Sequence, residues 1–241
     1  MSRHAVRRLY KEGNGSLQPL RSRWGGDFEQ IFQSNDTKET IVSIFRVREV
    51  DVHKDYLNPD AQLQVLDAVR DVVRAAPLFR PVTTRGTPMS VRMTSAGAFG
   101  WVSDRRGYRY EELHPSGVPW PAIPVYLLNI WRDVTGLARD PDCCLVNFYG
   151  EGARMGLHQD RDEADFSKPV VSVSLGDDGL FRVGNETRGG STQSIWLQSG
   201  DVVVMAQPAR LLYHGVDRIR FGSSKLLPQG GRINLTLRVV T

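Results

Sequence analysis

The sequence predicts a mainly β protein with flanking helices, in the α+β class, and three observations support this prediction. Short β-rich runs follow one another closely after Asp140, and turn residues separate them. No helical pattern lies between these runs, which argues against a βαβ order and a nucleotide-binding parallel sheet. Two stretches before Asp140 have the periodicity of amphipathic helices. Closely spaced short strands are typical of a β-sandwich or a β-barrel. The runs cover residues 143–149, 153–160, 169–176, 180–184, 194–198, 201–206, 210–216 and 232–240.

The first helix is expected over residues 58–76. Asn58 can cap its N-terminus, and Pro59 suits the first helical turn because an N–H there would have no partner. The apolar positions fall on one stripe of this helix. They are Leu63, Leu66, Val69, Val72, Val73 and Ala76. The second helix is expected over residues 121–136, where Gly136 closes it.

The composition is that of an ordinary globular protein and excludes several classes. The chain has 241 residues, of which 40% are hydrophobic, and no apolar run approaches the roughly 20 residues of a membrane span. The two cysteines, Cys143 and Cys144, are adjacent; they cannot form a cysteine-rich zinc site and are typical of a reducing compartment. We therefore expect a cytoplasmic protein that is not embedded in a membrane.

The formal net charge of +4 is concentrated at the N-terminus. Residues 1–24 carry six basic side chains and one acidic one, whereas the remaining 217 residues carry 25 basic and 26 acidic ones. We expect a basic, flexible N-terminal extension over residues 1–45. It is either an arm that binds nucleic acid or a solvated terminus without such a role, and the composition leaves both open.

Two histidines and one aspartate in the C-terminal β region have the spacing of metal ligands. His158 and Asp160 are two residues apart in a predicted strand, so their side chains lie on one face. His214 follows 54 residues after Asp160. Two imidazoles and one carboxylate form the facial triad of mononuclear non-haem iron enzymes, and the same set also suits zinc. Ligand identity leaves both metals open, and the alternative is that the histidines are structural.

The last predicted strand carries two arginines on one face. Its alternating polar positions are Arg232, Asn234, Thr236 and Arg238. If this face lines a cavity, the two arginines require an anionic ligand there, and a small dicarboxylate spans the distance between their tips. Asn147 and Tyr149, two apart on another strand, could add polar contacts. The alternative is an exposed edge strand with both arginines in solvent.

Nine segments, taken together, resemble the AlkB family of Fe(II)- and 2-oxoglutarate-dependent dioxygenases, in particular its bacterial members. Between about Met89 and Arg238 they read MSVRMTSAGAFGW, RGYRY, PWPAIP, CLVNFY, LHQDRDE, PVVSVSLG, GDVVV, RLLYHG and RINLTLR. The resemblance implies a double-stranded β-helix, or jelly-roll, core over residues 140–241 within a single dioxygenase domain over residues 46–241. Residues 78–119 are rich in glycine, proline, arginine and aromatic residues, which predicts hairpins and long loops. In the family, this region would be the substrate-recognition lid.

The resemblance also implies roles for individual residues. His158, Asp160 and His214 would bind Fe(II), the metal at which O₂ reacts. Arg232 and Arg238 would hold the two carboxylates of 2-oxoglutarate. The side chains that would assist them are Asn147, Tyr149 and Asn234.

Four further residues match positions on the substrate side of the family. Trp101 matches the aromatic residue that stacks on a flipped methylated base, opposite His158. Asp162 matches the acid near the amino group of the base, and Tyr108 matches a lid tyrosine near the substrate backbone. Arg188 lies in the diverged segment GNETRGGSTQS, roughly where an arginine of the substrate loop falls.

The activity that the resemblance implies is oxidative demethylation of 1-methyladenine- and 3-methylcytosine-type bases, a direct reversal of DNA damage. Decarboxylation of 2-oxoglutarate would be coupled to hydroxylation of the methyl group and release of formaldehyde. The expected partner is methylated single- or double-stranded DNA, with single strands preferred, bound by a monomer. The alternatives are the same chemistry on RNA, tRNA or a protein side chain, and, in another class, a non-enzymatic β-barrel that binds a ligand.

Overall fold

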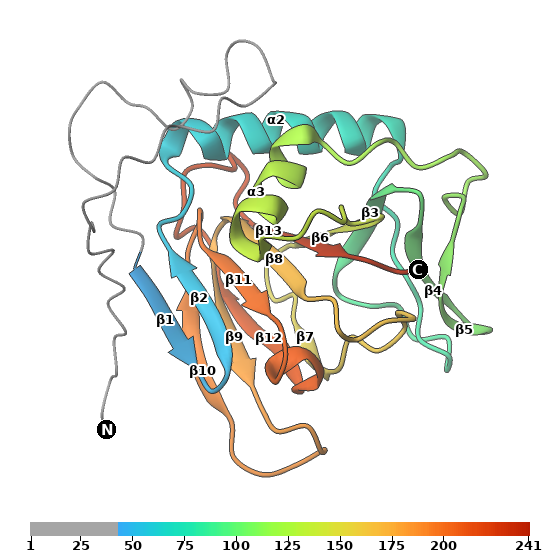
Figure 1. Cartoon of the computed structure of the whole chain (residues 1–241). Helices are drawn as coiled ribbons and strands as arrows, with labels where there is room; N and C mark the ends of the chain where they lie inside the picture. Colours follow the sequence, from blue (N-terminus) through green and yellow to red (C-terminus); the bar gives the residue numbers. More distant parts are fainter. Residues whose placement is uncertain (1–42) are drawn as a thin grey trace.

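The structure is a computed structural model that describes residues 43–241, and Figure 1 shows how its elements are arranged. Residues 1–42 of the expected N-terminal extension lie outside the described residues, and its last three residues, 43–45, belong to a strand rather than to a flexible terminus. The described part is mainly β, as predicted. Its elements are β1 (Ser43–Val47), β2 (Val50–Lys54), α2 (Pro59–Ala75), β3 (Arg92–Gly97), β4 (Gly100–Asp104), β5 (Gly107–Glu111), α3 (Val125–Thr135), β6 (Cys143–Tyr149), β7 (Met155–His158), β8 (Val170–Gly176), β9 (Asp178–Val183), β10 (Gln193–Leu197), β11 (Val202–Met205), the 3₁₀-helix η1 (Ala209–Leu211), β12 (His214–Arg220) and β13 (Arg232–Arg238).

Two antiparallel sheets form a sandwich. The larger sheet has the strand order β1-β2-β11-β8-β13-β6-β3, and the smaller one has the order β10-β9-β12-β7. Apolar side chains from both sheets, such as Phe181 of β9 and Val203 of β11, share one buried cluster between them. The last strand, β13, pairs with β8 on one side and with β6 on the other. The alternative of an exposed edge strand for the two arginines is therefore wrong.

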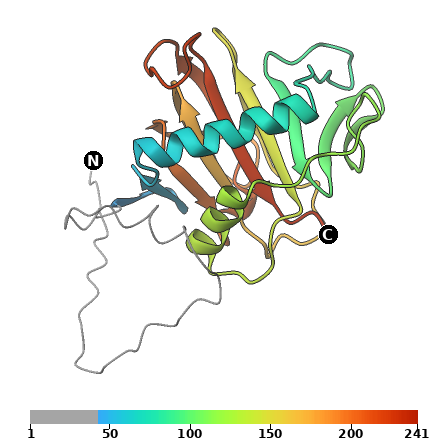
Figure 2. The same cartoon turned by 90° about the horizontal axis from the view of Figure 1, so that it is seen from above.

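Both helices cover the outer face of the larger sheet, as Figure 2 shows from above. Asn58 caps α2 as predicted, since its side chain accepts a hydrogen bond from the main-chain N–H of Ala61. The buried positions of α2 pack on apolar residues of β6, β8, β11 and β13. They are Ala61, Val65, Leu66, Val69 and Val72. Leu63, which we expected on this stripe, is 50% exposed because it lies beside the stripe rather than on it.

The second helix is shorter than predicted. It begins at Val125 rather than at residue 121, because Pro124 lies immediately before it and a proline disfavours helical backbone in the preceding residue. Gly136 closes the helix as expected, in the left-handed conformation. No helix among the described residues has the length and apolar character needed to cross a membrane.

Two differences concern strands. The expected strand over residues 210–216 begins only at His214, because residues 209–211 form η1. Strands β1 and β2 were not predicted, although β2 pairs with β11 inside the larger sheet. In β2 the buried Val50 and Val52 alternate with polar residues over five positions, a short form of the pattern that is typical of a half-buried strand.

The predicted hairpin region contains one prominent hairpin. Strands β4 and β5 pair with each other and form a separate two-stranded sheet. This hairpin stands beside β3 at one end of the sandwich (Figure 1). It carries Trp101 on β4 and Tyr108 on β5, so its position decides where both aromatic side chains lie.

Candidate active site

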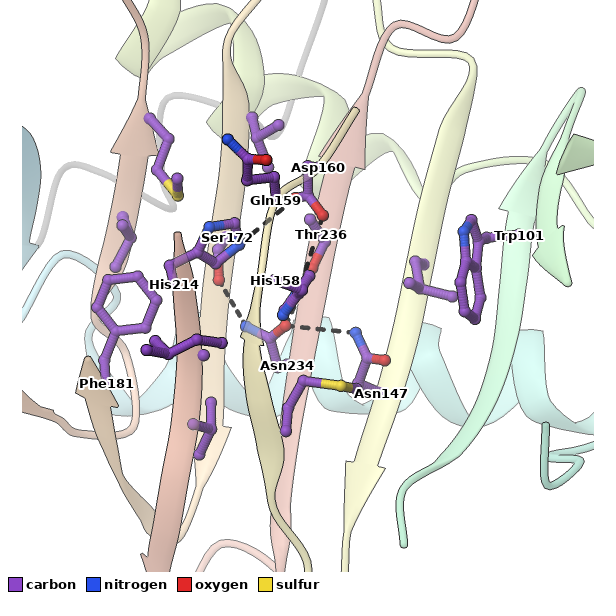
Figure 3. A pocket seen from close by; sticks show the side chains of 18 of the residues that line it. Trp101, Asn147, His158, Gln159, Asp160, Ser172, Phe181, His214, Asn234 and Thr236 are labelled. Atoms are coloured by element: carbon purple, nitrogen blue, oxygen red, sulfur yellow. Dashed lines mark hydrogen bonds and ion pairs between the residues drawn. The ribbon is translucent and has the colours of Figure 1, made fainter. Parts of the chain in front are cut away.

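A cavity of about 440 Å³ opens between the two sheets. Its walls include strands of both sheets and the β4–β5 hairpin. Figure 3 shows His158, Asp160 and His214 together in this cavity and Trp101 at one side of it. All twelve residues singled out in the sequence for the site line this one cavity. They are Trp101, Tyr108, Asn147, Tyr149, His158, Asp160, Asp162, Arg188, His214, Arg232, Asn234 and Arg238.

The two histidines meet because their strands pair. Strands β7 and β12 are antiparallel neighbours, and His158 and His214 are opposite partners in their register. The carboxylate oxygens of Asp160 lie 3.6 Å from Nε2 of His158 and 3.7 Å from Nε2 of His214. One ligand atom from each of these residues lies within 4.8 Å of the others, so a single ion can contact all three.

Main-chain hydrogen bonds orient both imidazole rings. Nδ1 of His158 is 2.9 Å from the carbonyl of Gly156, and Nδ1 of His214 is 3.0 Å from the carbonyl of Leu212. A carbonyl only accepts, so Nδ1 donates in both rings, and Nε2 of each neutral ring can bind a metal. Burial, together with the neighbouring His158, lowers the pKa of His214 to about 4, so His214 is neutral at pH 7.

Asp160 is buried but ionised. Burial alone would raise its pKa, yet the charge of Arg238, joined by His214 only in the acid range where that imidazole is protonated, outweighs burial and holds the pKa below its ordinary value. Oδ1 lies 2.8 Å from Nη2 of Arg238, whereas Oδ2 is buried without a hydrogen-bond partner. A buried, unpartnered carboxylate oxygen beside two imidazole Nε2 atoms suits a divalent cation such as Fe(II), so these residues fit the metal.

Arg232 is a fully buried cation that hydrogen-bonds only to neutral groups. Nη2 donates to Oγ of Ser174 at 2.7 Å, and Nη1 donates to the carbonyls of Asp177 and Leu197 at 3.3 and 3.4 Å. Its Nε has no partner, and burial lowers the pKa of the guanidinium. Gly179 makes room for it, since a Cβ there would lie 2.7 Å from Nε. A buried guanidinium with unused donors on a cavity fits an anionic ligand such as a carboxylate.

The pairing of β6 with β13 places the other polar residues. Asn147 is opposite Asn234, and Tyr149 is opposite Arg232. Nδ2 of Asn147 donates to Oδ1 of Asn234 at 3.4 Å, while Oδ1 of Asn147 is buried without a partner. Burial raises the pKa of Tyr149 to about 12, so its hydroxyl keeps its proton. The cavity therefore has a row of neutral hydrogen-bonding groups beside Arg232.

The hairpin and the segment after Asp160 form the exposed side of the cavity. Nε1 of Trp101 donates to Oδ2 of the exposed Asp162 at 3.0 Å. Tyr108 is 49% exposed and stacks on Trp101, with ring centroids 5.5 Å apart and an interplanar angle of 16°. The sequence placed these residues near one substrate, and the structure adds direct contacts between them.

Arg188 lies farther from the triad, in the loop between β9 and β10. It is exposed, and its guanidinium carbon is 5.8 Å from the ring centroid of Tyr213. It also lines an adjoining cavity of about 280 Å³, whose walls are mainly this loop. Arg188 is thus a residue of the cavity rim.

Three polar residues near the triad were not expected from the sequence: the partly buried Tyr110 and the buried Glu163 and Arg210. Glu163 and Arg210 form an ion pair at 3.0 Å with side chains 1% and 2% exposed. The hydroxyl of Tyr110 donates to Glu163 at 2.5 Å. The sequence does indicate a position for Tyr110, because it is two residues from Tyr108 and therefore shares the same face of the strand. Glu163 and Arg210 gave no such signal, since charged residues are mostly exposed.

Comparisons with known proteins agree with this geometry. The model of the 2OG-Fe(II) oxygenase superfamily matches residues 49–238. The chain is 53% identical over 189 residues to the alpha-ketoglutarate-dependent dioxygenase AlkB homolog of Caulobacter vibrioides, covering 78% of this chain and 86% of that protein. It is 39% identical over 184 residues to the alpha-ketoglutarate-dependent dioxygenase AlkB of Escherichia coli, covering 74% of this chain and 85% of that protein.

A solved structure is similar over nearly its whole length. The structure of OsALKBH1 superimposes with a TM-score of 0.70 at 29% sequence identity, covering 81% of this chain and 99% of that chain. These matches confirm the predicted double-stranded β-helix core and the predicted use of Fe(II) and 2-oxoglutarate. The chain belongs to the AlkB family of Fe(II)- and 2-oxoglutarate-dependent dioxygenases.

Proposed function

We propose that this dioxygenase demethylates 1-methyladenine- and 3-methylcytosine-type bases in DNA, with single strands preferred. Iron and 2-oxoglutarate, when bound, supply the oxidising chemistry that hydroxylates the N-methyl group. The hydroxymethylated base then releases formaldehyde, and the unmodified base is restored. The relatives named above carry the AlkB name, which supports the reaction class but not a particular lesion.

The observation that carries the proposal is the Trp101–Asp162 pair on the cavity that also contains the triad. A base inside a duplex cannot reach such a site, so it must leave the stack or come from a single strand. Stacking on an aromatic side chain contributes about 1–3 kcal/mol per base. A methylated base that carries a positive charge gains further from the indole face and from the nearby carboxylate of Asp162.

His158 offers the opposite side of the substrate position. Its side chain is 40% exposed, although its Nε2 lies beside Asp160. A base between Trp101 and His158 would therefore have an aromatic ring on each face and its methyl group near the metal ligands. This arrangement orients the methyl group, and the triad residues would hold the iron beside it.

The remaining site residues suit 2-oxoglutarate. Arg232 would bind one carboxylate, with Tyr149 and Asn234 beside it. Arg238 would bind the other, because its buried Nε has no partner although its Nη atoms contact Asp160 and Glu163. The two arginines begin and end β13, so the strand itself sets the distance between the two carboxylate positions.

Basic residues at the hairpin turn support binding of a nucleic-acid backbone. Arg105 and Arg106 are exposed beside Tyr108. Arg109, which the sequence places in the same basic patch, is instead engaged by Asp104 at 2.9 Å and by Glu111 at 2.5 Å. Arg106 also pairs with Asp104, at 3.2 Å. Among the described residues of the hairpin turn, the positive charge without a carboxylate partner therefore comes from Arg105, and it should make binding salt-dependent.

Mass spectrometry of a mixed pool of methylated oligonucleotides tests the proposal. DNA and RNA strands with 1-methyladenine or 3-methylcytosine are incubated with the protein, Fe(II), 2-oxoglutarate and air. We expect DNA strands to lose one CH₂ per lesion with release of formaldehyde, and the Asp160→Asn variant to leave them unchanged. Loss from RNA alone would assign the substrate to RNA, and no loss from any strand would contradict the proposed function.

A further inference from the structure

The β4–β5 hairpin contacts the segment that follows the metal ligand Asp160. Within the described residues, no β-ladder joins this hairpin to the two larger sheets. Trp101 and Tyr110 are opposite partners in its register. Trp101 donates to Asp162 at 3.0 Å, and Tyr110 donates to Glu163 at 2.5 Å. Each strand of the hairpin therefore holds one of the acids that come directly after Asp160.

Glu163 is buried between two arginines. Its Oε2 accepts from Nη2 of Arg210 at 3.0 Å, and its Oε1 lies 3.5 Å from Nη1 of Arg238. Arg210 also donates to the main-chain carbonyl of Asp160 at 2.6 Å. Arg210 therefore holds both ends of the segment 160–163 in place. The position of this segment in turn sets where the hairpin packs.

The hydroxyl of Tyr110 connects the hairpin to the 2-oxoglutarate side of the cavity. It has one proton, which it donates to Glu163, so its lone pairs accept from Nη1 of Arg238 at 2.9 Å. Nη2 of the same guanidinium contacts Oδ1 of Asp160 at 2.8 Å. A continuous path therefore runs from the hairpin that carries Trp101, through Tyr110 and Arg238, to the metal ligand.

We propose that Tyr110 and Glu163 are positioning residues that couple 2-oxoglutarate turnover to the presence of a base on Trp101. The proposal rests on the proposed function, because it requires a base that stacks on Trp101 and adds to the contacts of Asp162 and Glu163 that hold the hairpin. The guanidinium is a rigid planar fork, so a contact that fixes Nη1 of Arg238 also fixes the direction of its unpartnered Nε. Without the Tyr110 contact, only the carboxylates of Asp160 and Glu163 would orient the Arg238 guanidinium, and the direction of its Nε would no longer be fixed.

The Tyr110→Phe variant tests this path because it removes only the hydroxyl. Its matched control is Tyr56→Phe, which also removes a hydroxyl that donates to a carboxylate at 2.5 Å, that of Asp133, at a residue that does not line the cavity. Glu163→Gln is a second variant, which keeps the shape of the side chain and removes its charge. For each protein we measure the Kd of 2-oxoglutarate under anaerobic conditions with Mn(II), the Kd of a methylated oligonucleotide, the Tm, and the ratio of succinate to formaldehyde formed in air.

We expect Tyr110→Phe to raise the Kd of 2-oxoglutarate by about three- to tenfold, the effect of one lost hydrogen bond. The ratio of succinate to formaldehyde, which is one in coupled turnover, should rise several-fold. Glu163→Gln should change both quantities in the same direction. The Kd of the oligonucleotide should stay within about twofold of the wild type, and Tyr56→Phe should match the wild type in every measurement.

The coupling role would be overturned if Tyr110→Phe had the same succinate-to-formaldehyde ratio and the same Kd of 2-oxoglutarate as Tyr56→Phe. A lower Tm of Tyr110→Phe would not change this conclusion, because that combination describes a hydroxyl with a purely structural role. If the wild type formed no formaldehyde from methylated DNA, the proposed function would fail. The Kd of 2-oxoglutarate would then decide the role of Tyr110 by itself, because that measurement needs neither oxygen nor a base.

Discussion

Replacing Arg232 with methionine removes a guanidinium that the fold buries completely, at 0% exposure, beside the cavity. Its hydrogen-bond acceptors in the protein are a hydroxyl and two main-chain carbonyls, so no protein carboxylate is bonded to it. The nearby carboxylates of Asp201 and Asp178 stabilise the charge only from a distance, so a bonded anionic partner is missing until a ligand binds. Methionine keeps an unbranched side chain of similar length and removes the charge together with every donor.

The expected loss of affinity follows from this burial. Truncating one partner of a buried, hydrogen-bonded charge pair costs about 2–5 kcal/mol, because the other charge is left without a partner. At about 1.4 kcal/mol per factor of ten, the Kd of 2-oxoglutarate should rise by about 30-fold to about 4,000-fold. The Arg232→Lys variant should have a Kd of 2-oxoglutarate between those of the wild type and Arg232→Met, because lysine keeps the charge but lacks the planar guanidinium that matches a carboxylate.

Two measurements on the same protein check this expectation. The first is an anaerobic titration of Mn(II)-loaded protein with 2-oxoglutarate. The second is the Tm with and without the cosubstrate at about 100 times the wild-type Kd, where bound ligand stabilises the wild type by about 2.7 kcal/mol. For a chain of this size that is a shift of about 5–11 °C, and a 30-fold weaker variant should retain about 0.9 kcal/mol of it.

The control is Arg92→Met, since Arg92 is exposed and its guanidinium lies 4.8 Å from the ring centroid of Phe148. It should bind 2-oxoglutarate like the wild type. A folded Arg232→Met protein with a Kd within about threefold of the wild type would refute the reasoning. In that case the buried guanidinium would be compensated inside the protein and would not serve a dicarboxylate.

Three further outcomes are expected. His158→Ala should abolish succinate formation and lower the Mn(II) content in metal analysis. The control His53→Ala, at a residue outside the cavity, should change neither quantity. Full metal loading of His158→Ala would contradict the assignment of the triad. Trp101→Ala should raise the Kd of a methylated oligonucleotide by about 5-fold to about 150-fold, the equivalent of about 1–3 kcal/mol, and leave the Kd of 2-oxoglutarate unchanged. In the metal-free protein, the pKa of His214 is about 4, below the value of about 6.5 for an unfolded histidine, so the unfolded state takes up the proton first as the pH falls. The free energy of unfolding should then decrease from about pH 6.5 to about pH 4 by roughly 1 kcal/mol per pH unit. Chemical denaturation of wild type and His214→Gln should show this slope in the wild type only.

Local periodicity explains why so much of the site could be predicted. Residues two apart on a strand share a face, so the alternation along β13 places its polar side chains together wherever the strand lies. The same reasoning was wrong for Asp160, because β7 ends at His158 and Asp160 lies just beyond the strand. The structure confirms the alternation, because the apolar Ile233, Leu235 and Leu237 lie in the core beneath the helices. Membership of the dioxygenase family excludes the alternative of a non-enzymatic β-barrel.

Other expectations failed where side-chain contacts override a sequence pattern. Arg109 belongs to a basic stretch in the sequence, but Asp104 on the paired strand β4 and Glu111 on its own strand neutralise it. The strand expected before His214 is instead a 3₁₀-helix that places Arg210 in the interior, where its guanidinium meets Glu163 and the main chain of Asp160.

The sequence by itself determined which residues share a strand face, and hence the chemical class of the metal and cosubstrate sites. Only the tertiary structure decided that His214 meets His158, because that contact depends on the pairing of β12 with β7. It alone also revealed the path from Tyr110 through Arg238 to Asp160, since these residues are distant in sequence and the charges of Arg238 and Asp160 predict exposure. Burial of charged groups is set by which elements pack together, and sequence spacing carries no information about that packing.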